Sequence, residues 1–382
     1  MSTLNRELAI HLAEDPKLEV TLLVPEGACT EKEKREAKSY KVTIVDAKFQ
    51  PGYDPLYWLS FPPEDLSIDI VVGHGAKLGA PAQIIRNVLQ RKNCKWVQVV
   101  HTAPEDLGRY KRYTNSTSKG ENKHHLEVEL CKRADIVVSV GSWLANVYST
   151  YLRRWKEGKD IFTLTPGLFE REFGDLVHLV KQAVGKIAIF KVLMVGRCDE
   201  EDFEVKGYNI AAVAFTDHRL RNKPYELIVV GAPEGKQDKV KKELLKYGIV
   251  AGQLTVRKFV NSRDEVKTLF AEVNLVIMPS NSEGFGLVAL EALSAGLPIL
   301  VSRKSGFAKA LEEVSSERTC VMHSDDPAKW AEAIAEVHAG YEIRLKEIKD
   351  LKTSYGKMYS WKKQCEALVE RMREVNQDRS CE

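Results

Sequence analysis

Short runs of apolar residues recur along the whole chain, and most are separated by segments with helical periodicity. Ten such runs lie at residues 19–24, 41–45, 68–72, 96–100, 135–140, 190–195, 226–230, 254–260, 275–278 and 299–302. They are continuous rather than alternating in polarity, which is typical of strands covered by helices on both faces. The pattern predicts parallel sheets flanked by helices, which places the chain in the α/β class.

The length of 382 residues and the apolar content of 44% predict two domains, because one core rarely grows this large. We expect two Rossmann-like, doubly wound domains at residues 1–185 and 186–355. A ligand would bind at the carboxyl ends of their strands, in a cleft that both domains face. Residues 356–382 read as a helix that packs back across the domains, with Trp361 and Leu368 as its anchors.

Charge and cysteine usage exclude several classes of protein. The formal net charge of +3 is nearly balanced for this length and gives no reason to expect a nucleic-acid partner. The seven cysteines are scattered, odd in number and without C-x-x-C spacing, which favours a reducing compartment. The first thirty residues lack the apolar core of a signal peptide, and no window approaches a transmembrane span. We therefore expect a cytoplasmic protein.

One segment combines a glycine loop with two carboxylates. After the apolar run at 275–278, a Pro-Ser-Asn-Ser turn leads to Glu283, Gly284 and Gly286, and a helical pattern then carries Glu291 in its second turn. Backbone N–H groups at a helix start favour a phosphate. Carboxylates repel phosphate but accept hydrogen bonds from sugar hydroxyls, so the pair predicts a nucleotide-sugar site. Alternatively, Glu291 is a helix-surface residue, or Glu283 is a helix cap.

Two cations lie near the start of the second predicted domain. Arg197 follows the strand at 190–195, and Lys206 precedes a helix nine residues later. Together they could neutralise a diphosphate and stabilise the charge that grows as it leaves. Each alone could equally be a cation in a solvated loop.

The first predicted domain offers two histidines at strand ends. His74 and Gly75 belong to a glycine turn at residues 73–79 that nearly matches a dinucleotide fingerprint, but its third glycine comes one residue late. The next strand ends at Val100 without the acidic residue that would hold a ribose, which weakens the alternative of a dinucleotide-dependent oxidoreductase. His101 follows that strand and could bind a sugar hydroxyl or be a hydrogen-bonded structural group.

Taken together, these motifs resemble the E-x7-E signature of retaining glycosyltransferases of the GT-B fold, particularly glycosyltransferase family 4. The similarity covers nearly the whole chain. The matching segments are E-G-F-G-L-V-A-L-E at 283–291, S-A-G-L-P-I-L-V-S at 294–302, V-G-R-C at 195–198, K-G at 206–207, H-T at 101–102, A-D-I-V-V-S-V-G-S-W-L at 134–144 and T-P-G-L at 165–168.

The resemblance implies a role for each matching residue. Arg197 and Lys206 would bind the donor diphosphate, Glu283 would lie beside the donor sugar, Glu291 would hold the ribose, and His101 would lie close to the transferred sugar. Of these, Arg197, Lys206, Glu283 and His101 would form the catalytic set. The backbone amides of Gly284, Phe285, Gly286 and Leu287 would assist with the diphosphate, the base would rest near Phe259 and Val260, and His74 and Gly75 would lie on the acceptor side.

The implied activity is transfer of a hexose from a nucleotide sugar, with UDP as the expected nucleotide, to a hydroxyl acceptor. The resemblance further implies retention of anomeric configuration, no metal ion and no other cofactor. The sequence identifies neither the donor sugar nor the acceptor.

The chain departs from the family at its start. In the family, a strand and a glycine-rich loop precede the helix that residues 2–9 resemble. We therefore expect the first strand of the first sheet to be missing, which leaves backbone groups unpaired at about 1–3 kcal/mol each if buried and exposes apolar helix faces. This departure supports a second hypothesis: a catalytically silent nucleotide-sugar-binding or interaction module that is one part of a longer protein with additional domains.

Overall fold

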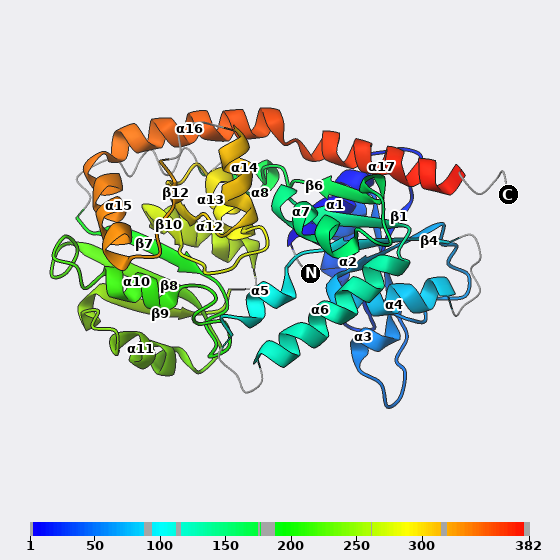
Figure 1. Ribbon diagram of the computed structural model, residues 1–382, viewed down its shortest axis with the longest axis horizontal. Coiled ribbons are helices and arrows are strands. Elements are labelled where there is room, and N and C mark those ends of the chain that lie inside the picture. Colours follow the sequence, from blue (N-terminus) through cyan, green and yellow to red (C-terminus); the bar gives the residue numbers. More distant parts are fainter. Residues whose placement is uncertain are drawn as a thin grey trace. The chain divides into compact units, whose positions relative to one another are not determined.

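The computed structural model describes residues 3–87, 94–111, 116–174, 176, 188–260, 262–314 and 319–377. The chain forms two compact units (Figure 1). The first unit comprises residues 1–103, 121–166 and 359–382, and the second unit comprises residues 104–120 and 167–358. The predicted boundary between residues 185 and 186 lies outside the described residues.

The second unit is built on a six-stranded parallel sheet in the order β12-β11-β10-β7-β8-β9. Its strands are β7 (Phe190–Val195), β8 (Tyr225–Ala232), β9 (Leu254–Lys258), β10 (Leu275–Met278), β11 (Ile299–Ser302) and β12 (Val321–Met322). The chain runs outward from β7 to β9 and then returns to place β10 on the other side of β7. This reversal is the topological switch point of the sheet, where α/β proteins bind their ligands.

Helices cover both faces of this sheet (Figure 1). On one face α10 packs against α11 and α15, and on the other α13 packs against α8, α14 and α16. The helices of this unit are α5 (Pro104–Gly108), α8 (Glu170–Phe173), α10 (Tyr208–Ala214), α11 (Gln237–Leu245), α12 (Arg263–Glu272), α13 (Leu287–Ser294), α14 (Gly306–Val314), α15 (Pro327–Ala339) and α16 (Tyr341–Met358).

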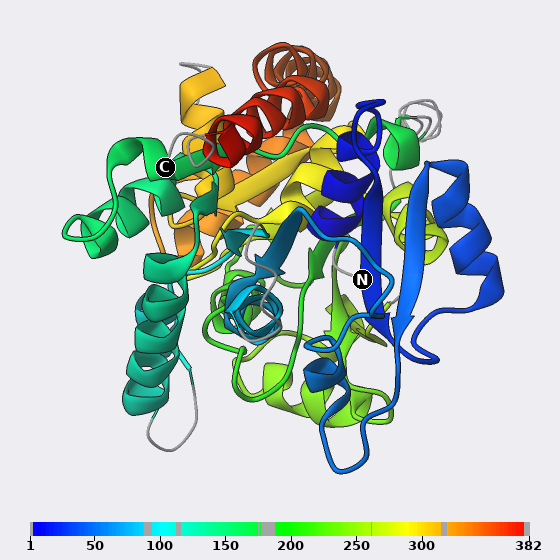
Figure 2. The same cartoon turned by 90° about the vertical axis from the view of Figure 1, so that its right-hand side faces the viewer.

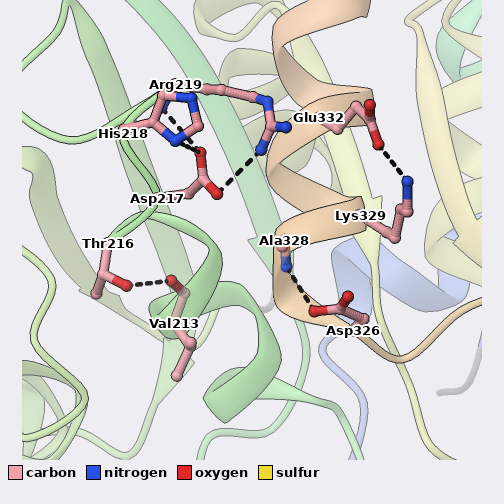
Figure 3. Close-up of polar contacts among 9 residues, drawn as sticks. All are labelled: Val213, Thr216, Asp217, His218, Arg219, Asp326, Ala328, Lys329 and Glu332. Atoms are coloured by element: carbon pink, nitrogen blue, oxygen red, sulfur yellow. Dashed lines mark hydrogen bonds and ion pairs between the residues drawn. The ribbon is translucent and has the colours of Figure 1, made fainter.

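Figure 3 shows charged residues beside α10 and α15 of the second unit. The guanidinium of Arg219 donates to Asp217 at 3.0 Å, and Lys329 donates to Glu332 at 2.8 Å on the surface of α15. The Asp326 carboxylate accepts from the amide of Ala328 and caps the helix. Arg219 and Asp217 thus form an ion pair that lies outside the loops following β7 and β10.

The first unit contains two parallel sheets, one of four strands in the order β3-β4-β5-β6 and one of two strands. The larger sheet comprises β3 (Ile70–His74), β4 (Lys95–Val100), β5 (Ile136–Val140) and β6 (Ile161–Leu164), and the smaller comprises β1 (Val20–Pro25) and β2 (Val42–Ala47). Every residue of β4 and β5 is buried, whereas β1 is only half-buried along its length. No strand among the described residues joins the two sheets, so the first sheet is divided.

The helices of the first unit are α1 (Thr3–Leu12), α2 (Glu31–Ser39), α3 (Pro55–Trp58), α4 (Gly75–Asn87), α6 (Ser116–Arg133), which begins in the second unit, α7 (Ser142–Leu152) and α17 (Trp361–Gln377). Figure 2 shows β1 and β2 side by side, with α2 lying against β2. Helix α4 packs against β3 and β4, which fixes the turn at His74 and Gly75.

The expectation of exposed apolar helix faces is wrong for α1. Leu4 and Leu8 are almost fully buried, because α17 packs against this helix. The rings of His11 and Trp361 stack at 5.6 Å, and Leu368 is buried as well. Trp361 and Leu368 therefore anchor α17 (Trp361–Gln377) within the first unit; that this helix packs across both domains stays a prediction.

The ten predicted strands are all present, with ends shifted by a few residues. The sequence missed β6 and β12, which are short and incompletely buried and therefore lack a continuous apolar run. Among the described residues, no helix combines the length and the apolar character needed to cross a membrane.

Candidate functional site

The loops that leave β7 and β10 bring Lys206 and Glu283 together at the switch point of the second unit. The Lys206 ammonium donates to Glu283 Oε2 at 2.6 Å, and the Ser280 hydroxyl lies 3.5 Å from the same oxygen. Both charged side chains are mostly buried. The cation offsets the repulsion that a lone carboxylate would exert on a phosphate in this loop.

Arg197, at the end of β7, is held by a second carboxylate. Arg197 Nη2 lies 3.1 Å from Asp202 Oδ2, and Lys111 Nζ lies 3.3 Å from Asp202 Oδ1. The Asp202 side chain is only 5% exposed, whereas that of Arg197 is 70% exposed. Asp202 therefore anchors one edge of the guanidinium and leaves the greater part of the Arg197 side chain accessible to a ligand.

The loops that carry Lys206 and Glu283 are fastened to each other by backbone contacts. The amide of Asn281 donates to Val205 O at 2.8 Å, and its side-chain amide donates to Glu204 O at 2.8 Å. Gly207 has a positive φ of 73°, and a Cβ at this position would lie 2.0 Å from Pro279 O. Only glycine allows this approach, so Gly207 fixes the separation of the two loops.

Helix α13 starts at the glycine loop, as predicted, with Gly286 at its N-cap. Glu291 lies in the second turn and is only 9% exposed, which excludes the alternative of a helix-surface glutamate. Glu283 precedes the N-cap and pairs with Lys206, so it is not the helix cap. Phe285 is buried and its carbonyl accepts from Phe307, so this residue would meet a ligand only through its amide.

Phe259 and Val260 follow β9, and the family resemblance predicts that the nucleotide base lies near them. Phe259 is 45% exposed, and its amide donates to Ala232 O at 2.8 Å. The backbone is thus fixed while the ring remains accessible. Their contact with a base stays a prediction.

Three residues of this region were missed by the sequence reasoning. Lys304 follows β11; its carbonyl accepts from the Glu283 amide at 3.2 Å, and its ammonium lies 5.7 Å from the centre of the Tyr110 ring. A lysine after an apolar run at the carboxyl edge of the sheet was a signal that could have identified Lys304. Lys111 and Asp202 had no such signal, because both lie in irregular segments and only tertiary folding joins them.

In the first unit, the strand ends β3 and β4 bring His74 and His101 together. His74 Nδ1 and His101 Nε2 are 3.0 Å apart, and the rings stack at 5.2 Å. Burial lowers the pKa of His101 to about 4, and burial together with the neighbouring His101 lowers the pKa of His74 to about 3. Both rings are neutral near pH 7, so one nitrogen of the pair donates and the other accepts.

A buried carboxyl group lies near Gly75, the residue that follows His74. Glu127 is 2% exposed, and its Oε1 lies 3.6 Å from the position that a Cβ on Gly75 would take. Burial raises the pKa of Glu127 to about 7. The Tyr148 hydroxyl donates to Thr102 O at 3.0 Å, which fixes the loop that begins at His101. No sequence signal marks Glu127 or Tyr148, since neither follows a strand.

Within the described residues, no group of three or more His, Cys, Asp and Glu side chains could hold a metal ion. The structure gathers Arg197, Lys206, Glu283 and Glu291 on the loops and helix at one switch point of the second unit, and His74, Gly75 and His101 at one edge of the first. That these two sets act on one ligand stays a prediction.

Comparison with known proteins identifies the family and the fold of this chain. The sequence profile of a family described as family 4 glycosyltransferases in conflict systems matches residues 1–368. D-inositol 3-phosphate glycosyltransferase from Corynebacterium urealyticum is 26% identical over 322 residues, which cover 81% of this chain and 72% of that protein.

Two solved structures have the same GT-B fold at low sequence identity. Sucrose-phosphate synthase from Thermosynechococcus elongatus superposes with a TM-score of 0.73 at 18% identity, covering 97% of this chain and 92% of that chain. HepE from Anabaena, solved in complex with UDP-glucose, superposes with a TM-score of 0.69 at 15% identity, covering 97% and 96%.

Gly207→Ala should separate the two loops at the switch point. A left-handed alanine costs about 1–2 kcal/mol, and displacing Pro279 should add about 1–3 kcal/mol. Gly235→Ala is the matched control, because Gly235 also has a φ of 73° but nothing lies within 4 Å of its added Cβ. Thermal unfolding should show a clearly larger loss of melting temperature for Gly207→Ala; equal losses would contradict the close contact.

Glu127→Gln should change how stability depends on pH. The folded carboxyl has a pKa of about 7 against an ordinary value of 4.5, so the wild type loses stability as pH rises from 4.5 to 7, by about 3 kcal/mol. Because glutamine stays neutral, the stability of the variant relative to the wild type should increase as pH rises from 4.5 to 7. Unfolding in urea at pH 5 and pH 8 measures the gain, with surface Glu129→Gln as the control; parallel profiles for wild type and Glu127→Gln would refute the assignment.

Proposed function

Because the chain belongs to the family 4 glycosyltransferases of conflict systems, we propose that it transfers a hexose from a UDP sugar to a hydroxyl acceptor with retention of configuration. The observation that carries this proposal is the Lys206–Glu283 pair beside the start of α13. A cation, a carboxylate and free helix-terminal amides in one loop match a ligand that contains both phosphate and hydroxyl groups.

In this proposal the diphosphate binds to Arg197, Lys206 and the amides at the N-terminus of α13. Asp202 holds the guanidinium of Arg197 in place before the donor arrives, so less side-chain freedom is lost on binding. The two cations neutralise the charge that develops on the leaving phosphate, which is the task that a metal ion performs in other transferases. We therefore propose that no metal ion is required.

The reaction exchanges one bond at the anomeric carbon for another. The bond from C1 of the sugar to the phosphate oxygen breaks, UDP leaves, and the acceptor oxygen forms a bond to C1 on the same face. The acceptor hydroxyl gives its proton to the departing phosphate oxygen. Glu283, paired with Lys206 at 2.6 Å, would accept hydrogen bonds from sugar hydroxyls, and Glu291 would accept them from the ribose.

His101 and His74 would act in this reaction as neutral hydrogen-bonding groups. Their low pKa values favour contact with a sugar hydroxyl over charge stabilisation, because an imidazolium would be largely absent near pH 7. In this assignment His74 fixes which nitrogen of His101 carries the proton.

A second candidate is a catalytically silent module that binds a nucleotide sugar. The divided sheet of the first unit favours it, because the donor residues lie in the second unit and do not depend on that sheet. Both candidates bind UDP, so only turnover distinguishes them. In either case we propose a cytoplasmic protein.

A donor panel tests the function. The protein is incubated with UDP-glucose, UDP-N-acetylglucosamine and GDP-mannose, and nucleotide release is measured with and without D-inositol 3-phosphate as an acceptor. Slow hydrolysis of a UDP sugar is expected from the enzyme. Clear UDP binding with no release from any donor would favour the silent module, and absence of binding to any nucleotide would overturn both candidates.

Arg197→Ala combined with Lys206→Ala should abolish nucleotide release, because the leaving diphosphate loses both cations. Removal of comparable charged contacts from transition states costs a hundredfold or more, on the order of 3 kcal/mol. Arg219→Ala is the matched control: it breaks a similar arginine–aspartate pair at 3.0 Å (Figure 3), and its rate should stay at the wild-type value. Retained release in the double variant would remove these cations from the site.

Glu291→Gln should weaken UDP binding roughly tenfold, because a hydrogen bond to a charged group contributes about 1.5–3 kcal/mol. Pyrophosphate lacks the ribose, so its affinity should not change. Calorimetric titration of both ligands into wild type and variant makes the comparison. Equal UDP affinities would show that Glu291 does not bind the ribose.

A further inference from the structure

Exposed aromatic residues are concentrated on one short segment of the first unit. Of the eleven large apolar side chains that are exposed in the described part of the chain, five lie within residues 49–61. They are Phe49 and Tyr53, which are 58% and 57% exposed, and Leu56, Tyr57 and Phe61, which are each 37% exposed. We call this group the aromatic platform. Contiguous apolar surface of this kind marks a binding site more often than chance.

The platform is ordered by ring contacts within residues 49–61. The rings of Tyr53 and Tyr57 stack at 4.7 Å with 20° between their planes, and Tyr57 meets Phe61 edge to face at 5.6 Å. Trp58 meets Phe49 edge to face at 5.0 Å. The rings are therefore held in a fixed array before any ligand binds, which lowers the entropy lost on binding.

The backbone supports this array. The Trp58 indole N–H donates to Tyr53 O at 3.0 Å, and the Asp54 carboxylate accepts from the Leu56 amide at 2.8 Å at the start of α3. Leu59 and Ser60 are buried and anchor the segment in the first unit. Figure 1 shows α3 and its flanking loop at the lower margin of this unit.

The charge of the segment limits what it can bind. Residues 48–69 contain four acidic residues and one lysine; the acidic ones are Asp54, Glu64, Asp65 and Asp69, and the lysine is Lys48. This excess of negative charge opposes nucleic acids, phosphorylated ligands and anionic membranes. Carboxylates and tyrosine hydroxyls are acceptors for neutral hydroxyl groups. Aromatic faces, meanwhile, provide apolar area for the C–H face of a sugar ring.

From these observations we propose that the aromatic platform binds a neutral oligosaccharide, with sugar rings packed against Phe49 and Tyr53, its two most exposed rings, and hydroxyls directed to acceptors of the same segment. The proposal deepens the proposed function by naming the class of acceptor, and it rests on that function for the acceptor role but not for binding. The occupant is a sugar chain rather than a monosaccharide, because the segment carries two ring clusters, Tyr53 with Tyr57 and Phe49 with Trp58, and each offers a separate packing position.

Calorimetric titration of neutral hexasaccharides tests the proposal. Maltohexaose, cellohexaose and chitohexaose are titrated into wild type, Tyr53→Ala/Tyr57→Ala and Tyr57→Phe. At least one sugar should bind the wild type, the double variant should lose tenfold or more in affinity, and Tyr57→Phe should retain binding because the ring remains. Trp155→Ala, which removes another exposed aromatic side chain, is the control and should bind like the wild type.

Other outcomes overturn the proposal. Failure of all three sugars to bind the wild type would do so, as would equal binding by the double variant. A nine-residue oligoarginine peptide that binds the wild type in their place and loses affinity in the double variant would instead assign the platform to a basic protein partner.

A UDP titration of the same proteins separates this proposal from the proposed function. The double variant should bind UDP like the wild type, because both substitutions lie in the first unit. If no protein binds UDP while the platform variants still lose the sugar, the proposed function fails and the platform stands. If UDP binds and no oligosaccharide does, the proposed nucleotide-sugar site is supported and the platform proposal fails.

Discussion

The contact between the loops that leave β7 and β10 is the constraint on which the donor-side chemistry depends. Gly207 approaches Pro279 so closely that no side chain fits between them, and Asn281 ties the second loop to the backbone of the first. These contacts place Lys206 within 2.6 Å of Glu283. An ion pair between two flexible surface chains contributes little, but here both side chains are mostly buried and the backbone holds them.

Paired charges explain how carboxylates can share a loop with phosphate-binding groups. Glu283 is neutralised by Lys206, and Asp202 lies between Arg197 and Lys111. In each case the carboxylate positions a cation instead of repelling the ligand. The Arg197 side chain is largely exposed, although Asp202, which holds it, is buried. Each carboxylate reduces the net positive charge of the loops but holds its cation in a fixed position, as preorganised binding requires.

The first unit uses polar groups in the opposite way. His74, His101 and Glu127 are buried where a charge would be costly, so burial lowers the pKa of both histidines and raises that of Glu127. The same unit leaves its aromatic platform exposed on a segment that excludes anions. A hydrogen-bonding edge without charge and an apolar surface with acidic neighbours are both suited to neutral hydroxyl compounds.

The α/β architecture, ten of the strands and the glycine loop with Glu283 and Glu291 could be predicted from the sequence, because continuous apolar runs and turn-forming glycines are local signals. The sequence also placed His74 and His101 at strand ends. Which charged side chains pair with each other became evident only in the folded chain. Lys206 pairs with Glu283, and Asp202 lies between Arg197 and Lys111. These contacts, like those that bury Glu127 and α1, involve residues that are distant in the chain. No local pattern encodes those contacts, because they arise from packing of one element against another.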